Sequence, residues 1–143
     1  MEEGRSRSPN AKGLREVGRG EGGEHVVKAI DGGAVKEKQN GKTLMRIRIT
    51  AEVDGVRSDY TITYGRYGKL NAAMGRATVR AGMEADAERF AAVIKALAGE
   101  EPKIRRMKDG RIKIVCYEGH LEGFARYAEL ADAIEKWLEE TSR

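Results

Sequence analysis

The strongest chemical signal in the sequence is the set of basic side chains in residues 103–117 (KIRRMKDGRIKIVCY). Asp109-Gly110 lies between two short runs with apolar alternation, which is typical of a two-residue hairpin turn and fixes the register of its strands. That register pairs Arg106 with Lys113 and Lys108 with Arg111, so four cations share one face. Because like charges opposite each other destabilise a sheet, this face needs an anionic partner. The pattern predicts a binding surface and not a reaction centre.

The titratable residues do not form a catalytic or metal-binding pattern. No cluster of His, Cys and carboxylate side chains has the spacing of a metal site, and no nucleophile–base set is visible. His25 and His120 are expected at the start of a strand and of a helix, and the single Cys116 is expected to be a buried thiol. We therefore expect no cofactor, no metal and no catalytic residue. A hydrolase remains a third alternative.

Two strands that precede this segment carry further cations. Residues 44–53 and 56–64 alternate in phase around Asp54-Gly55, another two-residue hairpin signal. The register places one apolar face on a core and one polar face toward solvent. Arg46 then faces Thr63 and Arg48 faces Thr61, which leaves both charges available to a partner, whereas Glu52 pairs with Arg57.

The next residues, 64–69 (YGRYGK), are expected to form a glycine-bounded loop with aromatic rings between cations. Such a loop could stack and clamp a nucleotide through Arg66, Tyr67 and Lys69. It could equally be a turn whose tyrosines cover the edge of the core. The glycines do not have the spacing of a phosphate-binding loop, which excludes a nucleotide hydrolase of that type.

The remaining elements define the fold class. A helix is predicted over residues 84–98, where apolar residues recur at helical spacing and Gly99 follows. A longer helix is predicted over residues 120–140, with an apolar and an acidic side and with Trp137 either at the core or at an interface. Short strands are predicted at residues 25–30 and 77–81.

These elements predict a single α+β domain over residues 25–143, in which two β-hairpins form an antiparallel sheet and two helices pack on one of its faces. Residues 1–24 contain six glycines and no apolar periodicity, and they are predicted to be a disordered, charged linker.

Charge is distributed unevenly along the 143 residues. The net charge is only +4 although 35% of the residues are charged. Residues 103–118 carry six cations and two carboxylates, for a charge of +4, whereas residues 119–143 carry three cations and six carboxylates, for a charge of −3. Charge separated in this way is typical of a one-sided binding surface. No apolar run reaches the roughly 20 residues that span a bilayer, so we expect a cytoplasmic protein without a membrane partner. The many Glu, Lys and Arg residues also resemble thermophile composition.

Four segments resemble the C-terminal part of the archaeal repeat-associated PaREP proteins, type two-b. They are residues 44–56 (LMRIRITAEVDGV), 84–97 (EADAERFAAVIKAL), 99–110 (GEEPKIRRMKDG) and 120–141 (HLEGFARYAELADAIEKWLEET). The resemblance extends over about residues 25–143 and implies an archaeal, intracellular protein that corresponds to the last module of longer members. It supplies no activity and no catalytic residues.

The element order also resembles half of a LAGLIDADG homing endonuclease, whose sheets read DNA with alternating Arg, Lys and Thr side chains. Such a face would here contain Arg46, Arg48, Arg57, Thr61, Thr63, Arg106, Lys108, Arg111 and Lys113. The first helix of that unit, which carries a metal-binding acidic residue, has no counterpart before Leu44. The resemblance is one of topology and implies DNA binding without cleavage.

Two functions from different classes follow from the sequence. The first is a non-catalytic module that binds DNA or RNA on a basic sheet face. The alternative is a protein-interaction or structural domain of a mobile-element protein, in which the cations pair with an acidic surface of a protein partner or of a second copy in a homodimer.

Overall fold

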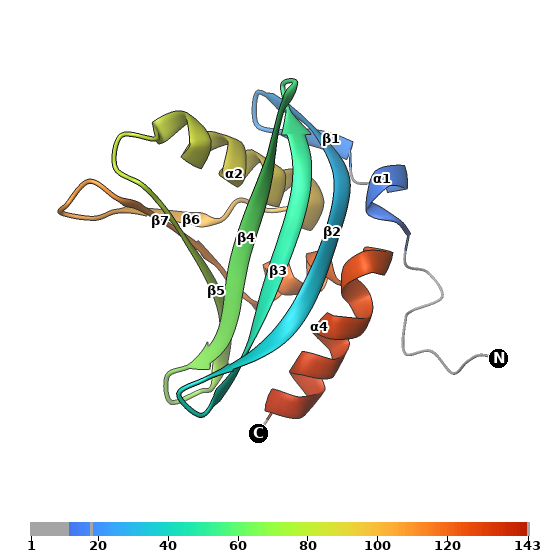
Figure 1. Ribbon diagram of the computed structural model, residues 1–143, viewed down its shortest axis with the longest axis vertical. Helices are drawn as coiled ribbons and strands as arrows, with labels where there is room; N and C mark the ends of the chain where they lie inside the picture. Colours follow the sequence, from blue (N-terminus) through green and yellow to red (C-terminus); the bar gives the residue numbers. More distant parts are fainter. Residues whose placement is uncertain (1–11, 18, 143) are drawn as a thin grey trace.

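The computed structural model describes residues 12–17 and 19–142, which form seven strands and four helices (Figure 1). In chain order these are α1 (Leu14–Val17), β1 (Arg19–Gly22), β2 (His25–Gln39), β3 (Lys42–Val53), β4 (Val56–Tyr67), β5 (Ala72–Val79), α2 (Glu84–Ala98), β6 (Lys103–Arg106), β7 (Ile112–Cys116), α3 (Glu118–Phe124) and α4 (Ala128–Thr141). The strands form one antiparallel sheet in the order β1-β2-β3-β4-β5-β7-β6. The α+β class is thus confirmed, but the sheet is much larger than the two predicted hairpins.

Two tight turns set the register of the three central strands. Asn40-Gly41 joins β2 to β3 with φ values of 52° and 80°, and Asp54-Gly55 joins β3 to β4 with φ values of 52° and 87°. A type I′ turn needs positive φ at both central residues, a conformation that Asn, Asp and Gly tolerate best. The β3–β4 register runs from Met45 opposite Tyr64 to Val53 opposite Val56, as the sequence predicts.

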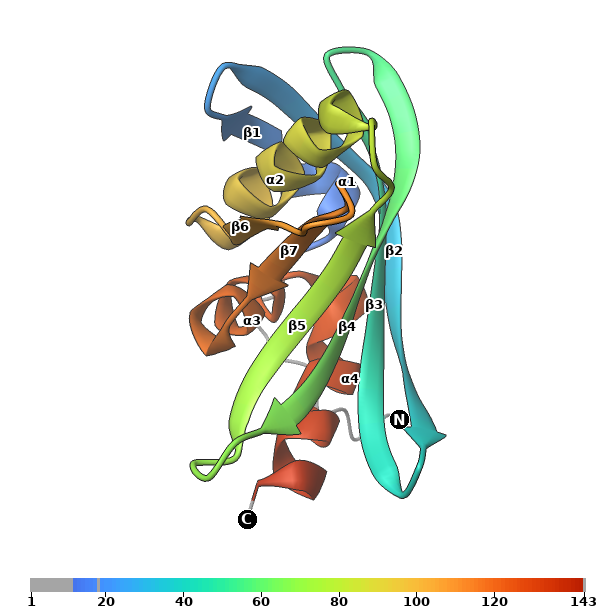
Figure 2. The ribbon, with the colours of Figure 1, turned by 90° about the vertical axis from the view of Figure 1, so that its left-hand side faces the viewer.

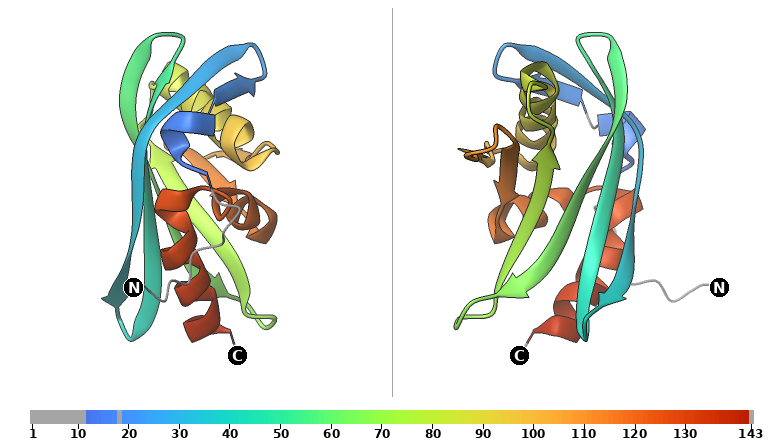
Figure 3. Two further views of the ribbon diagram at one scale, coloured as in Figure 1. Left: turned by 90° about the vertical axis from the view of Figure 1, so that its right-hand side faces the viewer. Right: turned by 60° about the vertical axis from the view of Figure 1, so that its left-hand side comes forward.

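The four helices pack on one face of this twisted sheet, which Figures 2 and 3 show from the side. That inner face carries the alternating apolar residues of β3 and β4, and Ile47, Ile49 and Ile62 are almost completely buried there. Burial of apolar area against α2 and α4 is the main force that holds these layers together. In the described part of the chain no helix lies on the opposite face, which we call the open face.

Strand β2 is the first correction to the predicted fold. It was expected to end at Asp31-Gly32-Gly33, but it continues to Gln39 with a bulge between Ala29 and Asp31. A Cβ at Gly32 would lie 2.6 Å from Leu14 Cδ1 and 3.0 Å from the carbonyl oxygen of Arg48. The glycine therefore lets α1 approach the strand, and it does not end the strand.

Strands β4 and β5 replace the predicted glycine-bounded loop. β4 continues through Tyr67, and only residues 68–71 form the turn. β5 begins at Ala72, five residues before the predicted strand. Its inner side consists of small residues, and a Cβ at Gly75 would lie 2.5 Å from the ring of Tyr64. Small side chains make room for the large aromatic ring of β4, and they also conceal the hydrophobic alternation that marks a strand.

The predicted C-terminal helix is interrupted. α2 has its predicted bounds and ends at Gly99 with φ 90°, but residues 125–127 separate α3 from α4. Lys12 accepts a backbone hydrogen bond from Ala128 at 2.6 Å and donates one to Arg126 at 3.2 Å. The hydroxyl of Tyr127 donates to the carbonyl of Leu97. These contacts to other segments satisfy the backbone where the helix is broken.

The structure also differs from the predicted linker over residues 1–24. Residues 12–17 and 19–24 include α1 and β1, and residues 1–11 and 18 lie outside the described residues. Leu14 is fully buried, and its backbone N–H donates to the Glu129 carboxylate at 2.9 Å. One large apolar side chain thus anchors this segment between β2 and α4.

We expect Leu14→Ala to lower the free energy of unfolding by about 2 kcal/mol, because it removes a buried side chain and leaves a cavity. Urea denaturation measures this change. Arg15→Ala, which changes an exposed neighbour, should stay within about 0.5 kcal/mol of the wild type. Equal stability of Leu14→Ala and the wild type would instead support the predicted linker.

Candidate functional site

The β6–β7 hairpin differs from the predicted hairpin by one residue of register. Lys103 lies opposite Val115, and Arg106 opposite Ile112. The turn is longer than predicted. A type I′ turn needs positive φ at both central residues, but of Asp109 and Gly110 only Gly110 has positive φ, at 92°. Instead, the Gly110 N–H donates to the carbonyl of Met107 at 2.9 Å, which gives a three-residue loop.

This shift places two of the four cations predicted to share a face on opposite sides of the sheet. Arg106 lies on the inner side, where its guanidinium donates to Glu84 of α2 at 2.6 Å, whereas Lys113 lies on the open face. The hydrogen bond from Arg106 holds the pKa of Glu84 below its ordinary value. Lys108 is in the loop, and Arg111 donates to Asp109 at 2.7 Å. Arg106 and Lys113 therefore do not share a face of the sheet as predicted, although both line one hollow of about 500 Å³ together with Arg105, Met107, Lys108 and Asp109.

A different set of cations meets on the open face. Arg105 lies opposite Lys113, and Arg76 and Lys103 lie on the two sides of Val115. Together with Met74 and Tyr117 these residues surround a hollow of about 310 Å³. We call this site the basic hollow: Met74, Arg76, Lys103, Arg105, Lys113, Val115 and Tyr117. It combines four cations, no carboxylate and an apolar floor.

The cations of the basic hollow are not neutralised within the described chain. There, no ion pair involves Arg76, Lys103, Arg105 or Lys113, whereas Lys36, Arg46 and Lys95 each pair with a carboxylate. The guanidinium of Arg76 lies over the ring of Tyr67, 4.2 Å from its centroid. Such stacking orients a cation without removing its charge.

Tyr117 is held at both backbone polar groups. Its N–H donates to Nδ1 of His120 at 2.9 Å, and its carbonyl accepts a hydrogen bond from the hydroxyl of Tyr64 at 2.9 Å. His120 is 2% exposed, and its Nε2 lies 2.9 Å from the carbonyl of Glu101. Because Nδ1 accepts, the proton of this imidazole lies on Nε2. Tyr117, whose backbone is fixed in this way, is still 39% exposed.

The other half of the open face carries cations mixed with carboxylates. Arg46 was predicted to be free, but it donates to Glu37 of β2 at 2.9 Å. Arg48 donates to Thr50 at 3.0 Å. A second hollow, of about 300 Å³, is lined by Arg15, Arg19, Lys28, Ala29, Ile30, Glu52 and Arg57. Here Glu52 offsets part of the positive charge, so this half is less suited to a polyanion than the basic hollow.

The three residues of the predicted nucleotide clamp, Arg66, Tyr67 and Lys69, do not lie together. Arg66 lies on the inner side, where Nε donates to Thr141 at 3.1 Å and the guanidinium carbon is 5.3 Å from the ring centroid of Trp137. It therefore fastens the end of α4 to the sheet. Lys69 is exposed in the β4–β5 turn. Tyr67 lies on the open face, where both Arg76 and Lys42 contact its ring.

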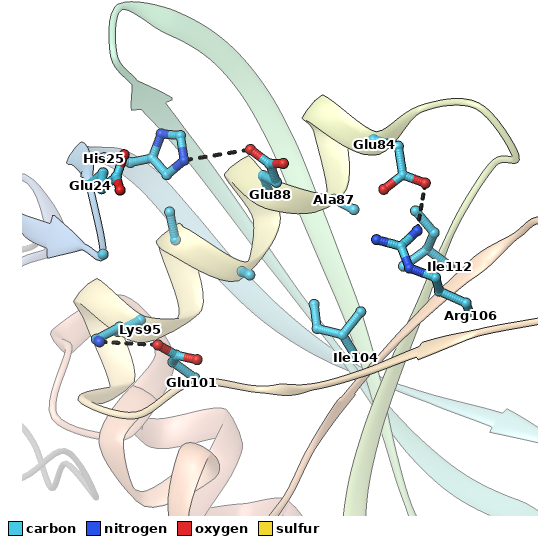
Figure 4. A pocket seen from close by; sticks show the side chains of 13 residues that line it. Glu24, His25, Glu84, Ala87, Glu88, Lys95, Glu101, Ile104, Arg106 and Ile112 are labelled. Atoms are coloured by element: carbon cyan, nitrogen blue, oxygen red, sulfur yellow. Dashed lines mark hydrogen bonds and ion pairs between the residues drawn. The ribbon is translucent and has the colours of Figure 1, made fainter.

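A larger groove, of about 440 Å³, lies between α2 and the β6–β7 hairpin (Figure 4). Ala87 and Ile104 contribute to an apolar floor. Two ion pairs lie on its rim, Arg106–Glu84 and Lys95–Glu101; His25 Nε2 lies 3.9 Å from Glu88, and Glu24 also lines the groove. Glu84 and Glu101 thus each have a cationic neighbour.

His25 also contacts the β3–β4 turn. Its Nδ1 lies 2.7 Å from Asp54 Oδ2, and the N–H of Val26 donates to the same carboxylate. These two hydrogen bonds, that of Val26 first, lower the pKa of Asp54. The contacts of His25 and Val26 with Asp54 hold the β3–β4 turn against the start of β2.

The described residues show no group of three or more His, Cys, Asp or Glu side chains able to hold a metal ion. Cys116 is fully buried, and burial raises the pKa of its thiol to about 12, so it is not a thiolate nucleophile near neutral pH. Among these same residues, no helix is both long and apolar enough to cross a bilayer.

Sequence reasoning missed Arg76, Lys103, Arg105 and Tyr117. The alternation around Ile104 places Lys103 and Arg105 on the face opposite to it, and this signal was available in the sequence. Arg76 could not be placed because β5 has little hydrophobic contrast. Tyr117 is significant only through its neighbours on β5 and β6, which depend on the order of strands in the sheet.

Comparison of the chain with family models, curated proteins and solved structures found no match.

Proposed function

We propose that the protein is a non-catalytic nucleic-acid-binding module and that the basic hollow is the centre of its binding surface. One observation carries the proposal: four cations from three adjacent strands converge on the open face without a carboxylate among them. A negatively charged polymer supplies the several anionic groups that such a cluster requires.

The cations of the hollow are suited to the phosphates of a nucleic acid. Arg76 and Arg105 offer planar guanidinium groups, which bind phosphate oxygens through two parallel hydrogen bonds, and the two lysines add point charges. Arg48 on β3 and Arg57 on β4 add cations to the same face outside the hollow, although Glu52 lies opposite Arg57. Because phosphate contacts release counterions, binding should weaken steeply with salt.

Edge protection is the simplest structural alternative for some of these charges. Lys103 and Arg105 lie on β6, which is an edge strand of the sheet, and cations on an edge discourage association with another sheet. Arg76 and Lys113 lie on β5 and β7, which have neighbours on both sides. Edge protection therefore does not account for the whole cluster.

The proposal is tested by fluorescence anisotropy with labelled DNA and RNA oligonucleotides at several salt concentrations. The triple variant Arg76→Ala/Arg105→Ala/Lys113→Ala removes three unpaired cations. We expect binding to weaken roughly tenfold to a hundredfold, and the slope of log K against log salt to fall by about 2 for a single strand.

A matched control removes the same net charge from cations that have carboxylate partners. Lys36→Ala/Lys95→Ala/Arg106→Ala does so, and Arg106 lies in the same hairpin as Arg105. We expect this variant to keep most of the wild-type affinity and salt slope. Absence of salt-dependent binding by the folded wild type, or equal losses in both variants, would refute the proposed function.

The resemblance to PaREP proteins suggests a mobile-element context for such a module but gives no activity. The likeness to half of a LAGLIDADG endonuclease is weaker than the sequence indicated, because five consecutive strands precede α2. The binding proposal rests on the basic hollow and not on these resemblances.

A further inference from the structure

We infer that the basic hollow seats one nucleotide of a single-stranded nucleic acid, with its base against Tyr117 and its flanking phosphates on the surrounding cations. This inference rests on the proposed function and deepens it, because it names the strand type and assigns a stacking residue. It applies equally to DNA and RNA, which share the base and phosphate chemistry involved.

The floor of the hollow is suited to a base and not to phosphate alone. Tyr117 is 39% exposed and lies on the open side of the chain just after β7, where Val115 and Met74 add apolar surface beside it. Every base has a π-face that an aromatic ring can stack on, independent of sequence. A site for phosphate alone would not need an exposed ring at its floor.

The cations are placed around this floor. Arg76 on β5 and Lys103 on β6 lie directly opposite Val115 on its two sides, and Lys113 and Arg105 form the next cross-strand pair. Neighbouring strands are about 4.8 Å apart, so Arg76 and Lys103 are separated by roughly 10 Å at the backbone. A base between them can therefore have a cation on each side to receive the phosphates that precede and follow it.

Tyr117 is also prepared for this role before a ligand arrives. The hydrogen bonds from Tyr64 and to His120 fix its backbone, and both partners are buried. Fixing the backbone that carries the ring removes part of the entropic cost of binding. Tyr67 is a less available platform, because Arg76 and Lys42 contact its ring, whereas the ring of Tyr117 has that of His120 beside it, with centroids 6.3 Å apart.

A duplex would use this site poorly. Its bases remain stacked on one another, and it presents mainly phosphates at its surface, so the ring and the apolar floor would contact nothing. Proteins that combine cations with exposed aromatic rings in one groove typically bind single strands.

Two substitutions at Tyr117 test the inference by anisotropy with a single strand, a duplex of the same sequence and an abasic single strand. We expect the wild type to bind the single strand more tightly than the duplex or the abasic strand. Tyr117→Leu should weaken single-strand binding about tenfold without a change of salt slope, whereas Tyr117→Phe should keep the affinity, because the ring and not the hydroxyl stacks.

The outcomes separate the two proposals. If the triple cation variant loses binding but Tyr117→Leu binds as the wild type does, or if the duplex binds as tightly as the single strand, the stacking site is refuted and the nucleic-acid function stands. If the wild type shows no salt-dependent binding to any of the three probes, both are refuted.

Discussion

Trp137→Ala is expected to lower the free energy of unfolding by about 3–5 kcal/mol, the loss typical of a large aromatic residue removed from a core. Trp137 is fully buried, and its ring meets that of Tyr64 edge-on with centroids 6.2 Å apart. Its indole Nε1–H donates to the carbonyl of Thr43 at 2.9 Å. This single side chain joins α4 to both β3 and β4, so its removal leaves a cavity and an unsatisfied carbonyl together.

Urea denaturation followed by circular dichroism measures this loss. One further variant isolates the contribution of the hydrogen bond, and a second serves as a control. Trp137→Phe keeps an aromatic ring but loses the hydrogen bond to Thr43, so we expect a loss of about 1–2 kcal/mol. Lys136→Ala changes an exposed neighbour on the same helix and should stay within about 0.5 kcal/mol of the wild type. A loss below about 1 kcal/mol for Trp137→Ala would mean that α4 does not need its contact with the sheet.

The position of Trp137 also bears on the two functions that the sequence left open. A tryptophan at an interface would have supported a protein-interaction domain, but this ring lies in the core. The acidic residues of α4 are also partly engaged within the chain, since Glu129 accepts from Leu14 and Glu140 from Lys36. Two of the features that favoured a protein partner therefore have structural explanations, whereas Arg76 and Lys113 of the basic hollow lie on interior strands and are not explained by edge protection.

The sequence predicted those parts of the fold that depend on local signals. The β3–β4 register follows from a turn in which Asp54 and Gly55 both accept positive φ, and α2 follows from its apolar spacing and from Gly99. The same reasoning placed the β6–β7 register one residue off. Asp-Gly is compatible with more than one loop length, and the sequence does not show which φ value Asp109 adopts.

The basic hollow could not be predicted for a related reason. Its residues come from β5, β6 and β7, and they meet only because β7 lies between the other two strands in the sheet. The alternation of each strand gives the face on which a side chain lies, but not which strands are neighbours. Strand order depends on how α2 crosses the sheet, and no local pattern encodes that path.

Gly123→Ala is expected to destabilise the protein, because the added Cβ would clash with the backbone of α2. Gly123 lies in α3 where that helix crosses the end of α2, and a Cβ there would be 2.6 Å from the carbonyl oxygen and 2.7 Å from the Cα of Ala98. These are backbone atoms, so the two helices must separate. We expect a loss of about 3 kcal/mol, because overpacking outweighs the gain of about 1 kcal/mol from the better helix former.

Gly119→Ala provides a matched control on the same helix. A Cβ at Gly119 would approach the side-chain carboxylate of Glu100, with Oε2 at 2.9 Å, and that carboxylate can rotate away. We expect Gly119→Ala to equal the wild type or to exceed it by up to about 1 kcal/mol. Similar effects of the two substitutions on the urea midpoint would show that helix propensity, and not the close approach of α3 to α2, governs this junction.

The close approach of α3 to α2 matters to the proposed site, because α3 begins directly after Tyr117 and His120 of α3 fixes the backbone of Tyr117. A Gly123→Ala variant that remains folded should therefore also bind single strands more weakly, with its salt slope unchanged.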